Sequence, residues 1–283
     1  MLGRSLTLGC RLGDNSGRPR PGLSLDQPGL AHPLAPGLQR SGRLPLIERA
    51  RSVEERDWSA IPWLRCLSGP QRDRALADLR VVDAQPGDFI CKIGRPANLW
   101  FGVLDGLMKM SNDASAGVSI TFTGIPPGAW FGEGTLLKRE AYRYNIEALR
   151  RTVVAGLPAA TFHGLLETSI PFNAYVMNLL NERLGQFIAA REVDRMSDPD
   201  VRVARSLAAL FNPVLYPLVG ELLRITQQEL GYLVGLSRQR VNESLRALAQ
   251  AGLIRVVYGG LQVLDLNGLR SFSPERHAGL STP

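Results

Sequence analysis

The sequence is short of the residues that build disulfide scaffolds and membrane spans. Only three cysteines, Cys10, Cys66 and Cys91, occur among 283 residues, and they are widely spaced. They can form neither a disulfide framework nor a Cys-x-x-Cys metal pair, which is typical of a protein from a reducing cytoplasm. No run approaches the roughly 20 apolar residues that cross a bilayer. We therefore predict a cytoplasmic protein with no membrane partner.

Patterns of catalytic residues are also missing. The three histidines, His32, His163 and His277, are far apart, and no nucleophile or carboxylate pattern flanks them. The sequence has no phosphate-binding loop, no GxGxxG and no HExxH motif. We predict that the protein is not an enzyme and has neither catalytic residues nor metal ligands.

Basic residues exceed acidic ones, 33 Lys and Arg against 26 Asp and Glu, for a net charge of +7. Such an excess suits a polyanionic partner such as DNA, because each cation near a phosphate releases a condensed counterion. Several of the arginines lie in residues 1–50, where Gly and Pro abound and large apolar residues are few. We predict that this segment is a disordered tail, either a passive extension or a basic arm that touches DNA.

Within residues 51–168 the sequence pattern changes from short helices to short β-prone runs. Short helices are expected from Val53 to Leu79, with an apolar face of Trp58, Ile61, Trp63, Leu64 and Leu67. From Val81 to Leu157, short β-prone runs alternate with Gly and Pro turns, which favours an antiparallel sandwich or barrel. The expected strands are Val81-Val82, Phe89-Ile90, Leu99–Leu104, Leu107–Met110, Val118–Phe122 and Val153-Val154.

Residues 169–198 read as one long helix. Pro171 suits its first turn, where a missing N–H costs nothing, and no breaker follows until Asp198-Pro199. The helix would be about 42 Å long, and its apolar stripe needs a second surface. That surface is either the helix's own domain or the same helix of a twin subunit. The stripe consists of Val176, Leu180, Leu184, Phe187 and Ile188.

The strongest motif lies between residues 225 and 252. Thr226, with Glu229 three positions later, forms a capping box that starts one helix. Gly235 permits a tight turn at positive φ, and Ser237 is the N-cap of a second helix that runs to Gln250. Two capped helices joined by a glycine turn predict a helix-turn-helix.

The second helix separates its residues into two faces. On a wheel of about 100° per residue, Val241, Leu245 and Leu248 form a buried stripe. A solvated polar face would explain the opposite side, but its side chains can also read base edges in a major groove. We predict that DNA contacts come from Arg238, Gln239, Asn242, Glu243 and Arg246, together with the cap residues Ser237 and Thr226.

Two β runs follow this helix, Leu253–Tyr258 and Leu261–Leu264, with Gly259-Gly260 between them as a two-residue turn. This hairpin predicts a wing beside the two helices. The winged helix-turn-helix is expected to cover residues 199–275, and residues 276–283 form a tail.

The order of these elements, from about residue 60 to residue 270, resembles the Crp/Fnr family of transcription regulators. The resemblance implies an α+β protein with a cyclic-nucleotide-binding-type β jelly-roll, a dimerisation helix and a C-terminal winged helix-turn-helix. It favours the twin-subunit choice for the long helix, with the stripe Val176 to Ile188 at the interface. The partners it implies are double-stranded DNA, a second copy of the chain and, as a candidate, RNA polymerase.

The resemblance also extends to an effector site. Phe131-Gly132-Glu133-Gly134 is similar to the start of the family's phosphate-binding cassette, in which Glu holds a ribose hydroxyl and Arg pairs with the cyclic phosphate. Glu133 and Arg143 keep the ten-residue spacing, but Tyr144 replaces the small hydroxyl residue. A cyclic nucleotide is therefore one candidate ligand, and a different effector or a structural relic is the other interpretation. The alternative from a different class is a cyclic-nucleotide-responsive enzyme subunit.

Other sensors fit the composition poorly. An iron–sulfur centre needs about four clustered thiolates, which three scattered cysteines do not supply. Haem needs an axial ligand, and His163 is more often an ordinary surface or core residue. The effector stays unidentified, and a regulator that binds DNA without any small molecule is a further alternative.

The base-reading positions differ from those of the best-known pattern. Family members with Arg, Glu and Arg at three contact points read a TGTGA-like half-site, whereas here Arg238, Gln239 and Glu243 stand there. Arg favours guanine, Gln favours adenine and Glu accepts from cytosine N4. We predict an altered palindromic operator with half-sites about one helical turn apart.

Overall fold

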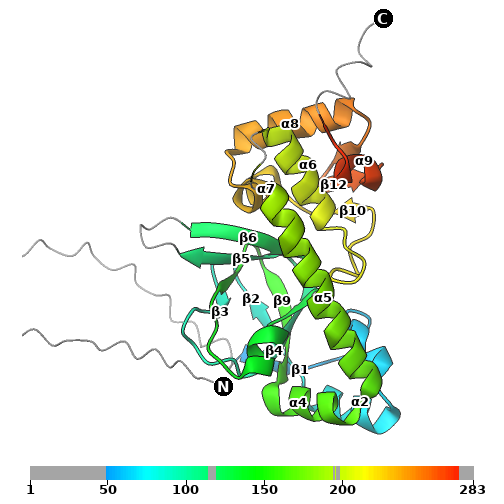
Figure 1. Cartoon of the computed structure of the whole chain (residues 1–283). Coiled ribbons are helices and arrows are strands. Elements are labelled where there is room, and N and C mark those ends of the chain that lie inside the picture. The colour runs from blue at the N-terminus through cyan, green and yellow to red at the C-terminus, as the bar shows by residue number, and fades with distance from the viewer. Residues whose placement is uncertain (1–48, 114–118, 194, 196–197, 274–283) are drawn as a thin grey trace, which may run out of the picture. The chain divides into compact units, whose positions relative to one another are not determined.

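A computed structural model describes residues 49–113, 119–193, 195 and 198–273 (Figure 1). The predicted tails, residues 1–50 and 276–283, lie outside the described residues except for positions 49 and 50. The chain is a mixed α and β protein, as predicted. Its first elements are β1 (Arg51–Ser52), α1 (Glu55–Trp58), a 3-10 helix (Pro62–Cys66) and α2 (Gly69–Asp78).

Two antiparallel sheets follow, in the orders β1-β2-β9-β4-β7 and β3-β8-β5-β6. Each of the six predicted runs overlaps a strand; Leu107 lies just before its strand, and Val118 lies outside the described residues. β7 and β8 escaped prediction because runs of two and four residues are too short for their pattern to stand out. The strands are β2 (Arg80–Ala84), β3 (Phe89–Cys91), β4 (Leu99–Asp105), β5 (Met108–Asp113), β6 (Ser119–Ile125), β7 (Trp130–Phe131), β8 (Asn145–Ala148) and β9 (Thr152–Pro158).

An aromatic cluster fills the core beside these sheets. The rings of Trp100 and Trp130 lie 4.6 Å apart between centroids, and Trp63 lies 5.1 Å from Trp130. Phe172, on the following long helix, lies 5.7 Å from Trp100. Such ring pairs stabilise the core beyond the contribution of the large area that aromatic side chains bury. The cluster therefore ties the start of the long helix to the β domain. Trp58, expected on the same apolar face, is instead 40% exposed.

Three further helices follow in this half of the chain: α3 (Glu133–Lys138), α4 (Ala159–Thr168) and the 24-residue α5 (Ile170–Val193). The prediction of a long helix is confirmed, although α5 ends at Val193, before the expected stop at Asp198-Pro199. At 1.5 Å per residue it is about 36 Å long. No helix in the described part of the chain is both long enough and apolar enough to cross a membrane.

The C-terminal half has its own core. The stripe predicted for the second helix, Val241, Leu245 and Leu248, is fully buried in it. A three-stranded sheet in the order β10-β12-β11 packs beside the helices. The elements are α6 (Pro199–Ala209), β10 (Leu222–Leu223), α7 (Gln227–Val234), α8 (Arg238–Gln250), β11 (Ile254–Val257), β12 (Gly260–Val263) and α9 (Leu266–Arg270).

The wing hairpin is present, but its turn is shifted by one residue. Val257 pairs with Gly260, so the turn consists of Tyr258 and Gly259, not Gly259-Gly260. Gly259 takes the positive φ of 76°. Gly260 belongs to β12, where a Cβ would lie 2.5 Å from the carbonyl oxygen of Leu223. Gly260 is therefore needed for the close approach of β12 to β10.

Candidate nucleic-acid interface and effector cassette

The helix-turn-helix is built by local hydrogen bonds at both helix starts. Thr226 Oγ1 accepts from the backbone N–H of Glu229 at 3.1 Å, and the backbone N–H of Thr226 donates to Glu229 Oε2 at 2.7 Å. This confirms the capping box of α7. Gly235 ends α7 at a φ of 66°, and Ser237 Oγ then accepts from the backbone N–H of Arg240 at 3.2 Å to start α8. The turn is thus specified by adjacent residues.

The capping box is also joined to the β domain. Arg150, between β8 and β9, donates from Nη2 to Glu229 Oε2 at 2.9 Å and to the carbonyl oxygen of Arg224 at 2.7 Å. Sequence analysis did not find this contact, because 79 residues separate Arg150 from Glu229. The start of α7 is therefore held by its cap and by an arginine from outside the helix-turn-helix.

The outer face of α8 carries the predicted DNA contacts. Arg238, Gln239, Glu243 and Arg246 are exposed, as the wheel requires. Gln239 Nε2 donates to Glu243 Oε1 at 3.3 Å, so the structure brings two of the three predicted base readers together. Asn242 is half-buried, and its Oδ1 accepts from Gln227 Nε2 on α7 at 3.0 Å.

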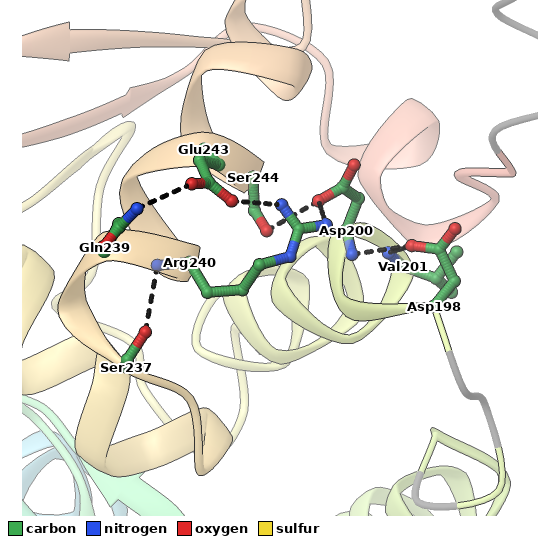
Figure 2. Close-up of polar contacts among 8 residues, drawn as sticks. All are labelled: Asp198, Asp200, Val201, Ser237, Gln239, Arg240, Glu243 and Ser244. Carbon is green, nitrogen blue, oxygen red and sulfur yellow. Dashed lines mark hydrogen bonds and ion pairs between the residues drawn. The ribbon is translucent and has the colours of Figure 1, made fainter.

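Sequence analysis missed Arg240, which lies on the flank of α8 that faces α6. Its guanidinium contacts Asp200 Oδ1 through Nη2 at 2.6 Å and Glu243 Oε2 through Nη1 at 3.2 Å (Figure 2). The spacing of three residues between Arg240 and Glu243 is a signal of a helical ion pair that the sequence did contain. The hydrogen bond to Asp200 joins α8 to α6, and no local sequence pattern predicts it.

The effector cassette begins at Gly132, which has a φ of 96° and precedes α3. Glu133 is 1% exposed, and its Oε1 accepts from Arg183 Nε on α5 at 2.9 Å. Arg183 also donates from Nη2 to the carbonyl oxygen of Trp130 at 2.7 Å. Burial is the largest single influence on the pKa of Arg183 and lowers it, but the charge and hydrogen bond of Glu133, together with nearby Tyr216 and Tyr144, raise the pKa more, so the net shift is upward. The cation beside Glu133 is thus Arg183, which sequence analysis did not single out.

Arg143 and Tyr144 have different surroundings from those that the cassette pattern implies. The Arg143 side chain is 74% exposed and contacts Glu140 Oε2 at 2.8 Å. Tyr144 is half-buried, its hydroxyl lies 3.4 Å from Thr135 Oγ1, and burial raises its pKa. Tyr144 is therefore a neutral hydroxyl with a partner inside the protein.

These residues fit a cyclic nucleotide only in part. Glu133 Oε2 is buried and has no hydrogen-bond partner among the described residues, so it can accept a ribose hydroxyl. Arg143, which the pattern assigns to the phosphate, is exposed and pairs with Glu140 instead of lying beside Glu133. The assignment of Glu133 to a ribose hydroxyl and of Arg143 to a phosphate stays a prediction; in the structure Glu133 contacts Arg183 and Arg143 contacts Glu140. The described residues contain no cluster of three or more metal-ligating side chains.

The long helix α5 has one face against its own domain and one exposed face. Val176 is 1% exposed within the β-domain core, so its prediction as an interface residue is corrected. Leu180 and Phe187 are partly buried against the same core. Leu184 and Ile188 are exposed, as an interface requires, and Met177, which sequence analysis missed, is 65% exposed one heptad before Leu184.

Comparisons with known proteins agree with these two halves. Residues 81–169 match the model of the cyclic nucleotide-binding domain, and residues 201–272 match that of the Crp-like helix-turn-helix domain. Transcriptional regulator SdrP of Thermus thermophilus is 30% identical over 207 residues, which cover 70% of this chain and 96% of that protein. The Cyclic AMP receptor protein of the same organism is 30% identical over 166 residues, 58% of this chain and 74% of that protein.

The fold is found among solved structures as well. FixK2 from Bradyrhizobium japonicum superposes with a TM-score of 0.54 at 15% identity, over 72% of this chain and 97% of that one. Fold and site together define a two-part regulator, in which a cyclic-nucleotide-binding-type domain precedes a helix-turn-helix domain. The chain belongs to the Crp/Fnr family of transcriptional regulators.

Proposed function

We propose that this regulator binds a palindromic operator as a homodimer and reads bases through Arg238, Gln239 and Glu243. The observation that carries the proposal is the capped helix α8, whose apolar stripe is buried while these three side chains are exposed together. A helix of this kind presents its N-terminal half to the major groove. Arg246, one turn further along the exposed face, is suited to a phosphate contact.

The dimer part of the proposal rests on the exposed face of α5. Met177, Leu184 and Ile188 are each at least 60% exposed and follow steps of seven and four residues. This spacing is typical of a helix that pairs with a copy of itself. Two copies of α8 would then meet half-sites about 34 Å apart, one turn of DNA. Contact with RNA polymerase belongs to this proposal as a consequence of the regulator class.

Selection of bound oligonucleotides by the purified protein tests the operator. The set Arg, Gln and Glu should enrich half-sites that present guanine, adenine and cytosine, because each base offers the matching donor or acceptor. The triple variant with alanine at Arg238, Gln239 and Glu243 should lose this selectivity. The matched control is Arg74→Ala, which removes an exposed arginine of α2, far along the sequence from α8. Enrichment of an unaltered TGTGA/TCACA site, or full selectivity in the triple variant, would refute the proposal.

A second candidate function is gating by a cyclic nucleotide. It is favoured by the buried Glu133 Oε2, which has no hydrogen-bond partner in the described part of the chain, and opposed by the exposed position of Arg143. Calorimetry with cAMP on the full chain separates the two. Binding at micromolar concentrations that Arg143→Ala abolishes would show that the cassette works. Without such binding, the effector is a different molecule or DNA binding needs none.

A further inference from the structure

Asp200, in the first turn of α6, is the centre of a hydrogen-bond network that ends at the exposed face of α8. Its Oδ1 accepts from Arg240 Nη2 and from Ser244 Oγ, each at 2.6 Å (Figure 2). Its own backbone N–H donates to Asp198 Oδ1, the N-cap of α6, at 2.7 Å. Asp200 is therefore held in place by the start of α6 and faces the flank of α8.

Arg240 connects Asp200 to the predicted base readers Glu243 and Gln239. Its second terminal nitrogen, Nη1, contacts Glu243 Oε2 at 3.2 Å, and Glu243 Oε1 accepts from Gln239 Nε2 at 3.3 Å. Both oxygens of the Glu243 carboxylate thus have a donor, although 47% of the side chain is exposed. The network runs from Asp200 through Arg240 and Glu243 to Gln239, as Figure 2 shows.

A carboxylate at a DNA interface needs such support for two physical reasons. The phosphates of DNA repel Glu243, and a guanidinium beside it offsets that repulsion. A long exposed side chain also loses rotamer freedom when it meets a base, and a side chain ordered beforehand loses less. The planar guanidinium of Arg240 contacts the two carboxylates through separate nitrogens in a fixed geometry, whereas a lysine ammonium is a single, freely rotating charge.

We propose that Asp200 and Arg240 are positioning residues that aim Glu243 at its base and so set the operator preference at that position. This inference rests on the proposed function, because it requires that Glu243 reads a base. Asp200 lies on α6, outside the helix that enters the groove, so it acts on specificity without a DNA contact of its own.

The rival role for Arg240 is a direct phosphate contact, and the two roles differ in salt dependence. Loss of a phosphate contact weakens binding to all sequences alike and lowers the salt slope by about 1. Loss of a positioning residue leaves that slope unchanged and weakens the preference for one base.

The experiment measures the affinity of the full chain for its selected operator and for operators changed at the Glu243 position, over a range of salt. Glu243→Gln should reduce the preference at that position about 5- to 150-fold, the range for one base contact. Asp200→Asn and Arg240→Gln should each reduce it at least about 3-fold with the salt slope kept, since the carboxylate is retained but less well aimed. In the double variant Asp200→Asn/Glu243→Gln, the preference should be no lower than in Glu243→Gln alone, because the two act on one contact.

Ser244→Ala is the matched structural control. It removes the other hydrogen bond to Asp200 Oδ1 but leaves Arg240 in place, so thermal stability should fall while the base preference stays at the parent value. Arg246→Gln is the control for a phosphate contact and should lower the salt slope. Arg240→Gln changes a partly exposed side chain, so it keeps the test available if Asp200→Asn fails to fold.

Each remaining outcome decides between the proposals. A parental base preference in both Asp200→Asn and Arg240→Gln, with a changed preference in Glu243→Gln, would overturn the positioning role alone. A lower salt slope with uniform weakening in Arg240→Gln would identify a phosphate contact and overturn it as well. An unchanged preference in Glu243→Gln would instead contradict the base-reading part of the proposed function.

Discussion

Two glutamate–arginine pairs in this protein have similar geometry and opposite surroundings. In the effector cassette, Glu133 and Arg183 meet at 2.9 Å with 2% and 14% of their side chains exposed. On α8, Glu243 and Arg240 meet at 3.2 Å with 47% and 33% exposed. The first pair joins two elements that are 50 residues apart, and the second lies within one helix.

This difference in burial determines what each pair can do. A buried pair has lost its water, so each charge depends on the other, and neither can leave without a large cost in stability. An exposed pair contributes little to stability, because water screens it, and its carboxylate stays open to a new partner. The Glu133 pair therefore secures α5 to the β domain, and the Glu243 pair is available to DNA.

The largest expected effect is on the stability of the buried pair. Arg183→Met leaves Glu133 as an uncompensated buried charge, and we expect a loss of about 3–5 kcal/mol in the free energy of unfolding. Urea denaturation of the full chain measures it. The matched control is Arg240→Met, which should cost less than half as much. Equal losses in the two variants would show that burial does not distinguish the pairs.

A second comparison concerns DNA recognition rather than stability. Glu243→Gln should change the base preference by about 1–3 kcal/mol at one operator position, because the amide both donates and accepts where the carboxylate only accepted. Glu133→Gln, provided that it folds, should leave the preference unaltered. Fluorescence anisotropy with single-base operator variants measures both. A change of preference in Glu133→Gln would mean that the cassette and α8 are not separable in this way.

Replacement of the cap of α8 affects its stability but not its chemistry. Ser237→Ala removes the acceptor for the backbone N–H of Arg240, and a loss of about 1 kcal/mol is expected. Thermal unfolding gives the value. Ser237→Asp, which restores an acceptor and places a negative charge at the helix start, should recover the loss. No recovery in the aspartate variant would argue that the serine is important for packing, not for capping.

The smallest expected effect concerns Arg143, the exposed arginine of the cassette, in contrast to the buried Arg183 of α5. Arg143→Ala removes an exposed ion pair with Glu140, and the free energy of unfolding should stay within error of the parent value, because water screens the pair. The same urea titration as for Arg183→Met measures it. A loss comparable to that of Arg183→Met would contradict the exposed placement of Arg143.

Much of the helix-turn-helix was predictable because the residues that specify it act on near neighbours in the sequence. Thr226, Gly235 and Ser237 act on backbone groups within a few residues of themselves, and the apolar stripe of α8 follows from helical periodicity alone. The wing turn was misplaced by one residue because two adjacent glycines suit a turn equally well by composition. Only the approach of β12 to Leu223 assigns Gly260 to the strand.

The effector cassette was predictable only as a pattern. The ten-residue spacing of Glu133 and Arg143 suggested two contacts to one ligand, and it gave no sign that Arg183 pairs with Glu133 or that Arg143 pairs with Glu140. Val176 was assigned to the dimer face because the helical stripe alone does not say which of its members pack inward. In both cases the deciding neighbours come from distant segments, which periodicity cannot identify.

By itself the sequence determined the order of the elements, the two helix caps and the side chains that α8 exposes, because these depend on contacts between near neighbours. The tertiary structure alone decided that Arg183 neutralises Glu133 and that Asp200 holds Arg240. Those choices depend on which distant charges lose water together, and only the packing of α5 against the β domain and of α6 against α8 brings them within reach.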